Sequence, residues 1–307
     1  MSLHMPARAT VLDGSLILVV ADGLGINALT YGLLKGWLAD GPSLPNLERY
    51  LKASRIAFMT TYSSSSWVTD SAASATAMAC GVKTKNGYVG MDAQGKPCMG
   101  VVEAAQAKGK VLGFVTNEDI TDATPAAFSA HALKRDDSKA ITRDQKRLAP
   151  RLLIGKDTVL PEFAGRKGED IALSDLARYA LRTLSAGSSG FFLLLETEKT
   201  DEAGHVNDTK ALLAALKELD DALAVVLDFQ SEHPQVSVAL ACDHDTGGPN
   251  ILEEKGGGVS VAWATRWHTA APAYFAVIGP AATQLPGLID NTDVAGFIRD
   301  ALSGSSH

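Results

Sequence analysis

The sequence lacks both a long apolar run and an excess of positive charge. No apolar stretch approaches the roughly 20 residues of a membrane-spanning helix, and Ser15–Ala21 is short enough for one buried strand. The chain has 28 Lys+Arg against 35 Asp+Glu, a net charge of −7. Because nucleic acids and anionic membranes attract surplus cations, we expect neither a nucleic-acid-binding surface nor a membrane span. Any phosphate group must be held locally.

Cysteine is also scarce. Cys80, Cys98 and Cys242 are odd in number and lack zinc-ribbon spacing, which excludes a disulfide framework and leaves the redox compartment open. The first residues, MSLHM, have neither the basic segment nor the apolar core of a signal peptide. We interpret residues 1–5 as a remnant of an expression vector, and a signal peptide could have been removed.

The composition is that of a globular protein. Of the 307 residues, 46% are hydrophobic and 21% are charged, which allows a sizeable core. We find no internal repeat and no linker, so we predict one domain over residues 6–307. We expect one loop around Gly247–Gly258 and a solvated excursion over Lys134–Arg151.

Apolar segments of strand length alternate with segments of helical period. This alternation predicts an α/β fold with a mostly parallel sheet between helices, in which functional sites lie at the carboxyl ends of the strands. The predicted strands are Leu16–Ala21, Val111–Thr116, Leu152–Gly155, Phe191–Leu195, Val236–Ala241 and Ala273–Ile278. The predicted helices are Ile26–Trp37, Pro125–Lys134, Leu173–Leu184, Lys210–Phe229 and Asp293–Leu302.

Carboxylates and imidazoles gather where these strands end. A single aspartate there is more often a helix cap or a salt-bridge partner, but the combination favours metal binding. Carboxylates with imidazoles suit zinc, whereas carboxylates with hydroxyls suit magnesium. The set is large enough for more than one ion: Asp22, Glu196, Asp201, His205, Asp243, His244 and His268.

Ser71 stands at the start of a predicted helix, Ala72–Ala79. It could simply be an N-cap, as most serines at such positions are. It could also be a nucleophile, because a helix N-terminus favours an alkoxide and receives an anionic phosphate. No Gly-x-Ser-x-Gly elbow and no Ser-x-x-Lys motif surrounds it, which points to activation by a metal.

Five segments together resemble alkaline phosphatases, and the resemblance runs from Asp22 to about Asp293. It implies an α/β sandwich, hydrolysis of phosphate monoesters, two zinc ions, one magnesium ion and a phosphoserine intermediate. The segments are TDSAASATAMACGVKTKNGYVGMD (69–92), DATPAAFSAH (122–131), LLETEKTDEAGH (194–205), CDHDTGG (242–248) and WHTAAP (267–272).

The resemblance also implies roles for individual residues. Ser71 matches the nucleophile, and Arg135 matches an arginine that clamps phosphate, on the same face as Thr124 if that helix continues. One zinc site would comprise Asp201, His205 and His268. The other would comprise Asp22, Ser71, Asp243 and His244, and the magnesium site would comprise Asp22, Thr124 and Glu196.

The chain departs from the family pattern in its short interval between His244 and His268, at Glu202, and at Cys242, which we interpret as a buried thiol next to Asp243. His268 follows only 24 positions after His244, so we expect a reduced fold without a crown domain. Glu202 follows Asp201 where relatives often carry a basic or aromatic residue, and Asp122 is also acidic. These two carboxylates predict weaker phosphate affinity.

The expected partners are phosphate monoesters and inorganic phosphate, and a homodimer is possible. The resemblance favours a periplasmic or secreted location, while the residues leave a cytoplasmic one open. A sister activity of the same superfamily, such as phosphodiesterase, sulfatase or phosphoglycerate mutase, is an alternative. A non-catalytic metal or phosphate binder is a second alternative, although it would not need Ser71.

Overall fold

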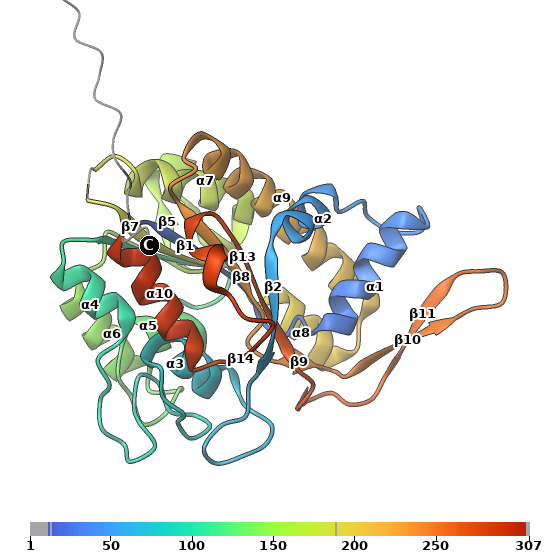
Figure 1. Cartoon of the computed structure of the whole chain (residues 1–307), viewed down its shortest axis with the longest axis horizontal. Helices are drawn as coiled ribbons and strands as arrows, with labels where there is room; N and C mark the ends of the chain where they lie inside the picture. The colour runs from blue at the N-terminus through green and yellow to red at the C-terminus, as the bar shows by residue number, and fades with distance from the viewer. Residues whose placement is uncertain (1–11, 13, 188, 305–307) are drawn as a thin grey trace, which may run out of the picture.

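The computed structural model describes residue 12, residues 14–187 and residues 189–304. Its centre is a sheet of eight strands (Figure 1). Residues 1–5, interpreted above as a vector remnant, lie outside the described part. The strand order is β14-β2-β13-β8-β1-β7-β3-β4. The strands are β1 (Leu16–Ala21), β2 (Arg55–Thr60), β3 (Val111–Thr116), β4 (Leu152–Ile154), β7 (Phe191–Thr197), β8 (Ser237–Ala241), β13 (Ala273–Ile278) and β14 (Leu288–Asp290).

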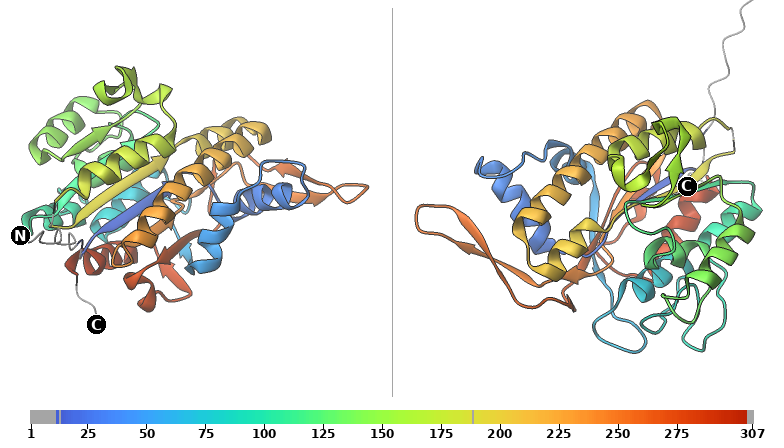
Figure 2. Two further views of the ribbon diagram at one scale, coloured as in Figure 1. Left: turned by 90° about the horizontal axis from the view of Figure 1, so that it is seen from above. Right: turned by 180° about the vertical axis from the view of Figure 1, so that it is seen from behind.

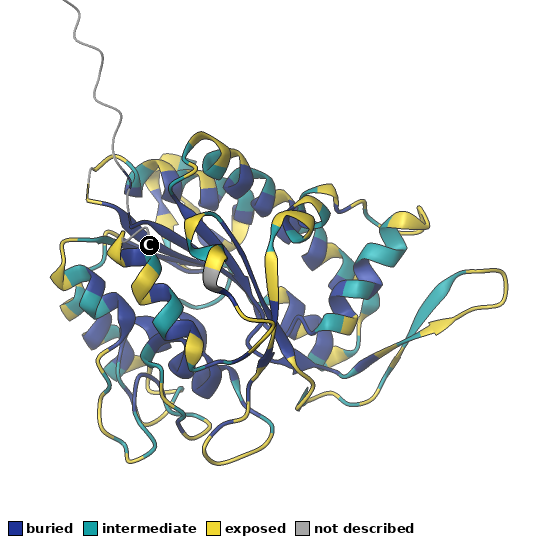
Figure 3. Ribbon diagram, in the orientation of Figure 1, coloured by how far each residue is buried: buried dark blue, intermediate teal, exposed yellow. Residues whose placement is uncertain are grey.

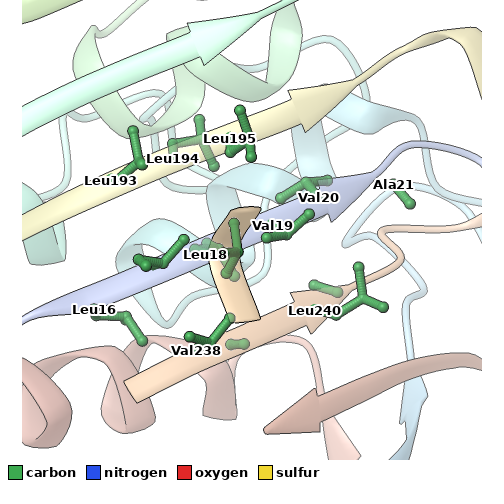
Figure 4. Packing of buried hydrophobic residues seen from close by; sticks show 14 of the residues in the cluster. Leu16, Leu18, Val19, Val20, Ala21, Leu193, Leu194, Leu195, Val238 and Leu240 are labelled. Atoms are coloured by element: carbon green, nitrogen blue, oxygen red, sulfur yellow. The ribbon is translucent and has the colours of Figure 1, made fainter. Parts of the chain in front are cut away.

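The sheet is mostly parallel, as predicted. Strands β8, β1, β7, β3 and β4 run parallel to one another, and β13 alone runs antiparallel to its neighbours β8 and β2. Their near-continuous apolar sequences are typical of strands covered on both faces. Leu18, Leu194 and Leu240 pack in this way at the centre of the core (Figure 4). The central strands are buried along their length, and exposure lies in the edge strand β2, a projecting hairpin and the surrounding helices and loops (Figure 3).

Two groups of helices cover the sheet (Figures 1 and 2). One group contains α1 (Ile26–Trp37), α2 (Pro45–Ala53), α7 (Leu173–Leu184), α8 (Lys199–Val206) and α9 (Thr209–Glu232), and its other members all contact α9. The second group contains α3 (Ser71–Cys80), α4 (Val101–Ala107), α5 (Ala123–Ser129), α6 (Ser138–Leu148) and α10 (Asp293–Ser303). Within the described residues, none of these helices combines the length and apolar character needed to cross a membrane.

Helix α5 is shorter than the predicted helix Pro125–Lys134. It ends at Ser129, and Ala130 is extended. Beyond it, Ala132 and Val89 exchange backbone hydrogen bonds of 2.8 and 2.9 Å. This tertiary pairing draws the chain out of the helix, so the expected helical face that would join Thr124 to Arg135 does not exist.

Two segments that we predicted as a solvated excursion and a loop contain regular secondary structure. The excursion Lys134–Arg151 contains α6, which Asp137 caps through Ala140 N at 3.0 Å and which buries Ile141. Few apolar residues anchor this helix. Its charged composition therefore indicated only a solvated excursion. The glycine-rich loop contains the hairpin of β10 (Pro249–Glu253) and β11 (Val259–Trp263), which projects from the molecule (Figure 2). Gly256 and Gly257 lie in its turn with φ of 105° and 88°.

Strand β2 was not predicted. Its exposed Ile56 and Phe58 alternate with buried Ala57 and Met59, so the larger apolar side chains lie on the exposed face and hide the usual pattern. Between His244 and His268 the chain forms only the hairpin and the short pair β9 (Asp245–Thr246) and β12 (His268–Thr269). This interval agrees with the expected reduced fold.

Candidate active site

The predicted site residues converge at the carboxyl ends of three adjacent parallel strands. In the order β8-β1-β7, Asp243 follows β8, Asp22 follows β1 and Glu196 lies near the end of β7. The backbone N–H of Asp22 donates to the Thr197 carbonyl at 3.1 Å, and Gly23 N–H donates to Asp243 Oδ1 at 3.2 Å. These bonds hold the strand ends together.

Asp201, His205 and His268 form the first group of potential metal ligands. Asp201 and His205 are four residues apart on α8, which places both side chains on one face. Asp201 Oδ2 lies 3.0 Å from His205 Nε2, and Asp201 Oδ1 lies 3.7 Å from His268 Nε2. The pairing of β12 with β9 brings His268 to this position from a distant part of the chain.

Backbone carbonyls orient both imidazoles of the first group. His205 Nδ1 donates to the Arg266 carbonyl at 2.7 Å, and His268 Nδ1 donates to the Thr69 carbonyl at 3.0 Å. The Nε2 atom of each imidazole therefore faces Asp201. Histidine ligands of metals usually donate their other ring N–H to a carbonyl or carboxylate in this way. The hydrogen bond to Asp201 raises the pKa of His205, whereas burial lowers the pKa of His268.

Asp22, Asp243 and His244 form the second group, and all three are buried. His244 Nε2 lies 3.3 Å from Asp22 Oδ1 and 3.2 Å from Asp243 Oδ2. Burial and the neighbouring His268 lower the pKa of His244, which keeps it in the neutral, ligating form. The His244 and His268 rings stack with their centroids 3.6 Å apart, so the first two groups adjoin.

Thr246 connects these two groups and was not predicted. Its hydroxyl donates to Asp201 Oδ1 and lies 3.2 Å from His244 Nδ1. A threonine two residues after a potential metal-ligating histidine carries no distinctive sequence signal. Its role becomes visible only once the pairing of β9 with β12 is known.

Asp22, Glu196 and Glu198 form the third group, and Thr124 adjoins it. Thr124 Oγ1 donates to Asp22 Oδ2 at 3.4 Å. Burial raises the pKa of Glu196 to about 8 and raises that of Glu198 as well. Glu198 was missed in the sequence, although it lies two residues after Glu196 at the same strand end.

Several carboxylate oxygens of the second and third groups are buried without a hydrogen-bond partner. Leaving such charged oxygens unpaired is costly, and divalent cations would neutralise them. The residues therefore fit metal ions. The unpartnered oxygens are Asp22 Oδ1, Asp243 Oδ2, Glu196 Oε1, Glu196 Oε2 and Glu198 Oε2.

Ser71 lies beside the second group, at the first residue of α3. Its Oγ is 3.0 Å from His244 Nε2. The predicted N-cap role falls instead to Asp70, whose Oδ1 accepts from Ala73 N–H at 2.9 Å. Asp70 Oδ2 also accepts from Gly87 N–H at 2.8 Å, which ties the start of α3 to the following loop.

Arg135 reaches the site although α5 ends before it. Its Nη1 lies 3.6 Å from Asp70 Oδ2, and its Nη2 lies 3.3 Å from Asp122 Oδ1. These two carboxylates hold the guanidinium group beside the start of α3. Its placement thus comes from ion pairs and from the loop after α5, and not from a helical face shared with Thr124.

A cavity of about 840 Å³ opens in front of Ser71. It brings together Ser71, Arg135 and the complete first group, and it also contains Glu202, the departure noted in the sequence. Its lining is Ser71, Arg135, Glu198, Lys199, Asp201, Glu202, Ala203, His205, Val206, Ala211, Ala214, Ala215, Glu218 and His268.

The chain is similar in sequence to known alkaline phosphatases. The chain is 28% identical to alkaline phosphatase 3 of Bacillus subtilis over 77% of this chain and 62% of that protein. It is 31% identical to an alkaline phosphatase of Schizosaccharomyces pombe over 76% of this chain and 56% of that protein. The chain thus spans about three fifths of the length of these curated relatives.

Solved structures show the same fold. The alkaline phosphatase of the Antarctic bacterium TAB5 has a TM-score of 0.81 at 24% identity, covering 96% of this chain and 99% of that one. The alkaline phosphatase of Thermus thermophilus has a TM-score of 0.82 at 20% identity, covering 96% and 92%. The family described as "Alkaline phosphatase" matches residues 14–159 and 152–261, and the chain belongs to this alkaline phosphatase family.

Proposed function

We propose that this chain hydrolyses phosphate monoesters through a phosphoserine at Ser71. The observation that carries the proposal is the placement of Ser71 Oγ, 3.0 Å from His244 Nε2, at the start of α3 and in one cavity with Arg135. A serine that served only as a helix cap would not need a metal-ligand group beside it.

The ligand groups support two zinc ions and one magnesium ion. The groups Asp201–His205–His268 and Asp22–Asp243–His244 mix carboxylates with imidazoles, which suits zinc. The third group offers only oxygen atoms, which suits magnesium. Bound cations would lower the pKa of a serine hydroxyl and neutralise charge on a transferring phosphoryl group. A TAB5 alkaline phosphatase variant is described with Mg bound in its M3 site.

The side chains of the chain itself account for two successive displacements. In the first, Ser71 Oγ forms a bond to phosphorus as the bond to the alcohol oxygen breaks, and the alcohol leaves with a proton. In the second, a water oxygen forms a bond to phosphorus as the Ser71 Oγ–phosphorus bond breaks, which releases inorganic phosphate. The planar guanidinium of Arg135 can hold two phosphoryl oxygens through both steps.

The same proposal includes a compartment and an assembly. Because the family resemblance favours export, we propose a periplasmic or secreted location for the natural protein. A homodimer remains a prediction that a sedimentation measurement would check.

Turnover of three esters tests the reaction class. The zinc- and magnesium-loaded protein should hydrolyse p-nitrophenyl phosphate faster, by orders of magnitude, than bis(p-nitrophenyl) phosphate or p-nitrophenyl sulfate. A preference for the diester would transfer the protein to the phosphodiesterases. Absence of turnover for all three esters at full metal occupancy would favour the non-catalytic binder.

Acid quenching tests the intermediate separately. With a ³²P-labelled monoester, the label should be recovered on Ser71, and Ser71→Ala should remain unlabelled. Ser64→Ala is a matched control, because Ser64 is exposed on the loop before α3. Unlabelled but active wild-type protein, under conditions where the quench traps phosphoserine, would replace the covalent route by direct attack of water.

A further inference from the structure

We infer that Glu198 is a ligand of the cation held by the third group, together with Asp22, Glu196 and Thr124. The inference rests on the proposed metal centre, but it does not depend on turnover. It enlarges the magnesium site that the family resemblance implied, which contained two carboxylates, to a site with three.

Distances and missing partners support this assignment. One carboxylate oxygen from each of Asp22, Glu196 and Glu198 lies within 4.8 Å of the others. Glu198 Oε2 is buried and has no hydrogen-bond partner, as is also true of Asp22 Oδ1 and both Glu196 oxygens. In the described part of the chain, no lysine or arginine forms an ion pair with Glu198. A bound cation would supply the missing partner for the side chains of Glu196 and Glu198.

The backbone holds Glu198 in place for this role. The residue joins β7 to α8, and its N–H donates to Asn117 Oδ1 at 3.0 Å. Asn117 Nδ2 donates in turn to Thr197 Oγ1 at 3.2 Å. The Glu198 carbonyl accepts from Asp201 N–H at 2.9 Å. These bonds fix the start of its side chain relative to β3, β7 and the first ligand group.

Glu198 also connects the third group to the cavity. Glu196 is fully buried, whereas Glu198 lines the same cavity as Ser71 and Arg135. The third group therefore adjoins the cavity through Glu198. A third carboxylate also increases the negative charge around the cation and favours an oxygen-preferring ion such as Mg²⁺ over zinc.

Glu198→Gln tests the inference, with Glu202→Gln as the matched control. Both substitutions remove one charge from the same cavity lining, but only Glu198 belongs to the third group. Titration calorimetry with Mg²⁺ on zinc-loaded protein, without substrate, should show affinity about 10-fold or more lower for Glu198→Gln. Glu202→Gln should stay within about 2-fold of wild type, and both variants should retain two zinc ions.

The melting temperature gives a second readout. Without metal, Glu198→Gln should melt at or above the wild-type temperature, because it relieves repulsion among three closely spaced carboxylates. With saturating Mg²⁺, the order should reverse. A variant that melts lower in both conditions, or that binds Mg²⁺ as tightly as wild type, would overturn the inference and leave Glu198 a structural residue. Because no substrate is used, failure of the proposed phosphatase activity would be seen separately.

Discussion

The inner wall of the cavity, around Ser71 and Arg135, differs from its outer wall along α8 and α9 in how the side chains are held. At the inner wall, Ser71 lies beside His244, and Arg135 pairs with Asp122 and Asp70. Besides polar residues such as Lys199 and Glu218, which form an ion pair, the outer wall presents small apolar side chains that make no directional bonds. These are Ala203, Val206, Ala211, Ala214 and Ala215.

The difference follows from the elements that build each wall. The potential metal ligands beside Ser71, which are Asp22, Asp243 and His244, stand at the ends of buried parallel strands, where hydrogen bonds and ion pairs are shielded from water. The outer wall belongs to surface helices, and Val206 is 59% exposed. Under the proposed function, this arrangement would hold a phosphoryl group closely and would contact the rest of a substrate weakly. Substitutions should have larger effects at the inner wall than at the outer one.

The largest effect is expected at Ser71. Ser71→Ala should lower kcat by at least about 10³-fold, because the covalent route loses its nucleophile. Zinc content and circular dichroism should stay unchanged, as they should for Ser64→Ala. Steady-state kinetics at saturating metal will measure the loss, and a kcat within 10-fold of wild type would place the nucleophile elsewhere.

Metal affinity and stability should respond to pH in opposite directions. Burial raises the pKa of Asp243 to about 7 and that of Glu196 to about 8, and the bond to Asp201 raises the pKa of His205. Protons therefore compete with metal ions up to about pH 8, so zinc and magnesium affinity, and activity with it, should rise from pH 6 to pH 8. A chelator should abolish activity reversibly.

The stability of the metal-free protein should change with pH in the opposite direction: it should fall as the pH rises. A carboxyl group whose pKa is raised by folding ionises first in the unfolded chain, so Asp243 and Glu196 make the folded state lose stability between about pH 4 and pH 8. Denaturant unfolding of the chelated protein at pH 5 and pH 8 will measure this loss. Equal stability at the two pH values would contradict the assigned shifts.

A smaller effect is expected at Arg135. Arg135→Ala should lower kcat/KM by about 10–100-fold, the range for losing hydrogen bonds to a charged group. Arg135→Lys should recover only part of the lost kcat/KM, because an ammonium group cannot hold two oxygens in the fork geometry. The exposed Arg178→Ala is the control. Equal rates for Arg135→Ala and Arg178→Ala would show that Arg135 serves only to pair with Asp70 and Asp122.

The smallest effect is expected at the rim of the outer wall. Glu202→Lys should tighten inhibition by phosphate by about 2–5-fold, because an exposed charge is screened by solvent. Glu232→Lys, the same change at the far end of α9, should leave the inhibition constant unchanged. If Glu202→Lys changed the inhibition constant as strongly as Arg135→Ala changes kcat/KM, the two walls would not differ in the way described.

Much of the sheet and many candidate ligands could be predicted because their signals are local. Strands such as β1 and β7 are continuous apolar runs, and the ligand residues Asp22 and Asp243 follow directly after their strands. Asp201 and His205 lie at helical spacing on one short helix. The end of α5 could not be predicted, because the pairing of Val89 with Ala132 determines it.

Glu198 and Asp70 show a further limit of sequence reasoning. Both are acidic residues next to a predicted site residue or strand end, where solvated carboxylates are also common. Only burial and missing partners distinguish Glu198 from the exposed Glu202, and only the bonds to Ala73 and Gly87 distinguish Asp70.

The sequence by itself determined which chemical groups stand at the strand ends, because apolar runs and helical periods are properties of neighbouring residues. Tertiary structure decided which of these groups meet. Asp22, Ser71 and His244 are far apart in the chain and come together through the strand order β8-β1-β7 and the packing of α3. Arg135 reaches the same cavity through ion pairs with Asp70 and Asp122. Contacts of this kind depend on distances across the folded core, which no local pattern encodes.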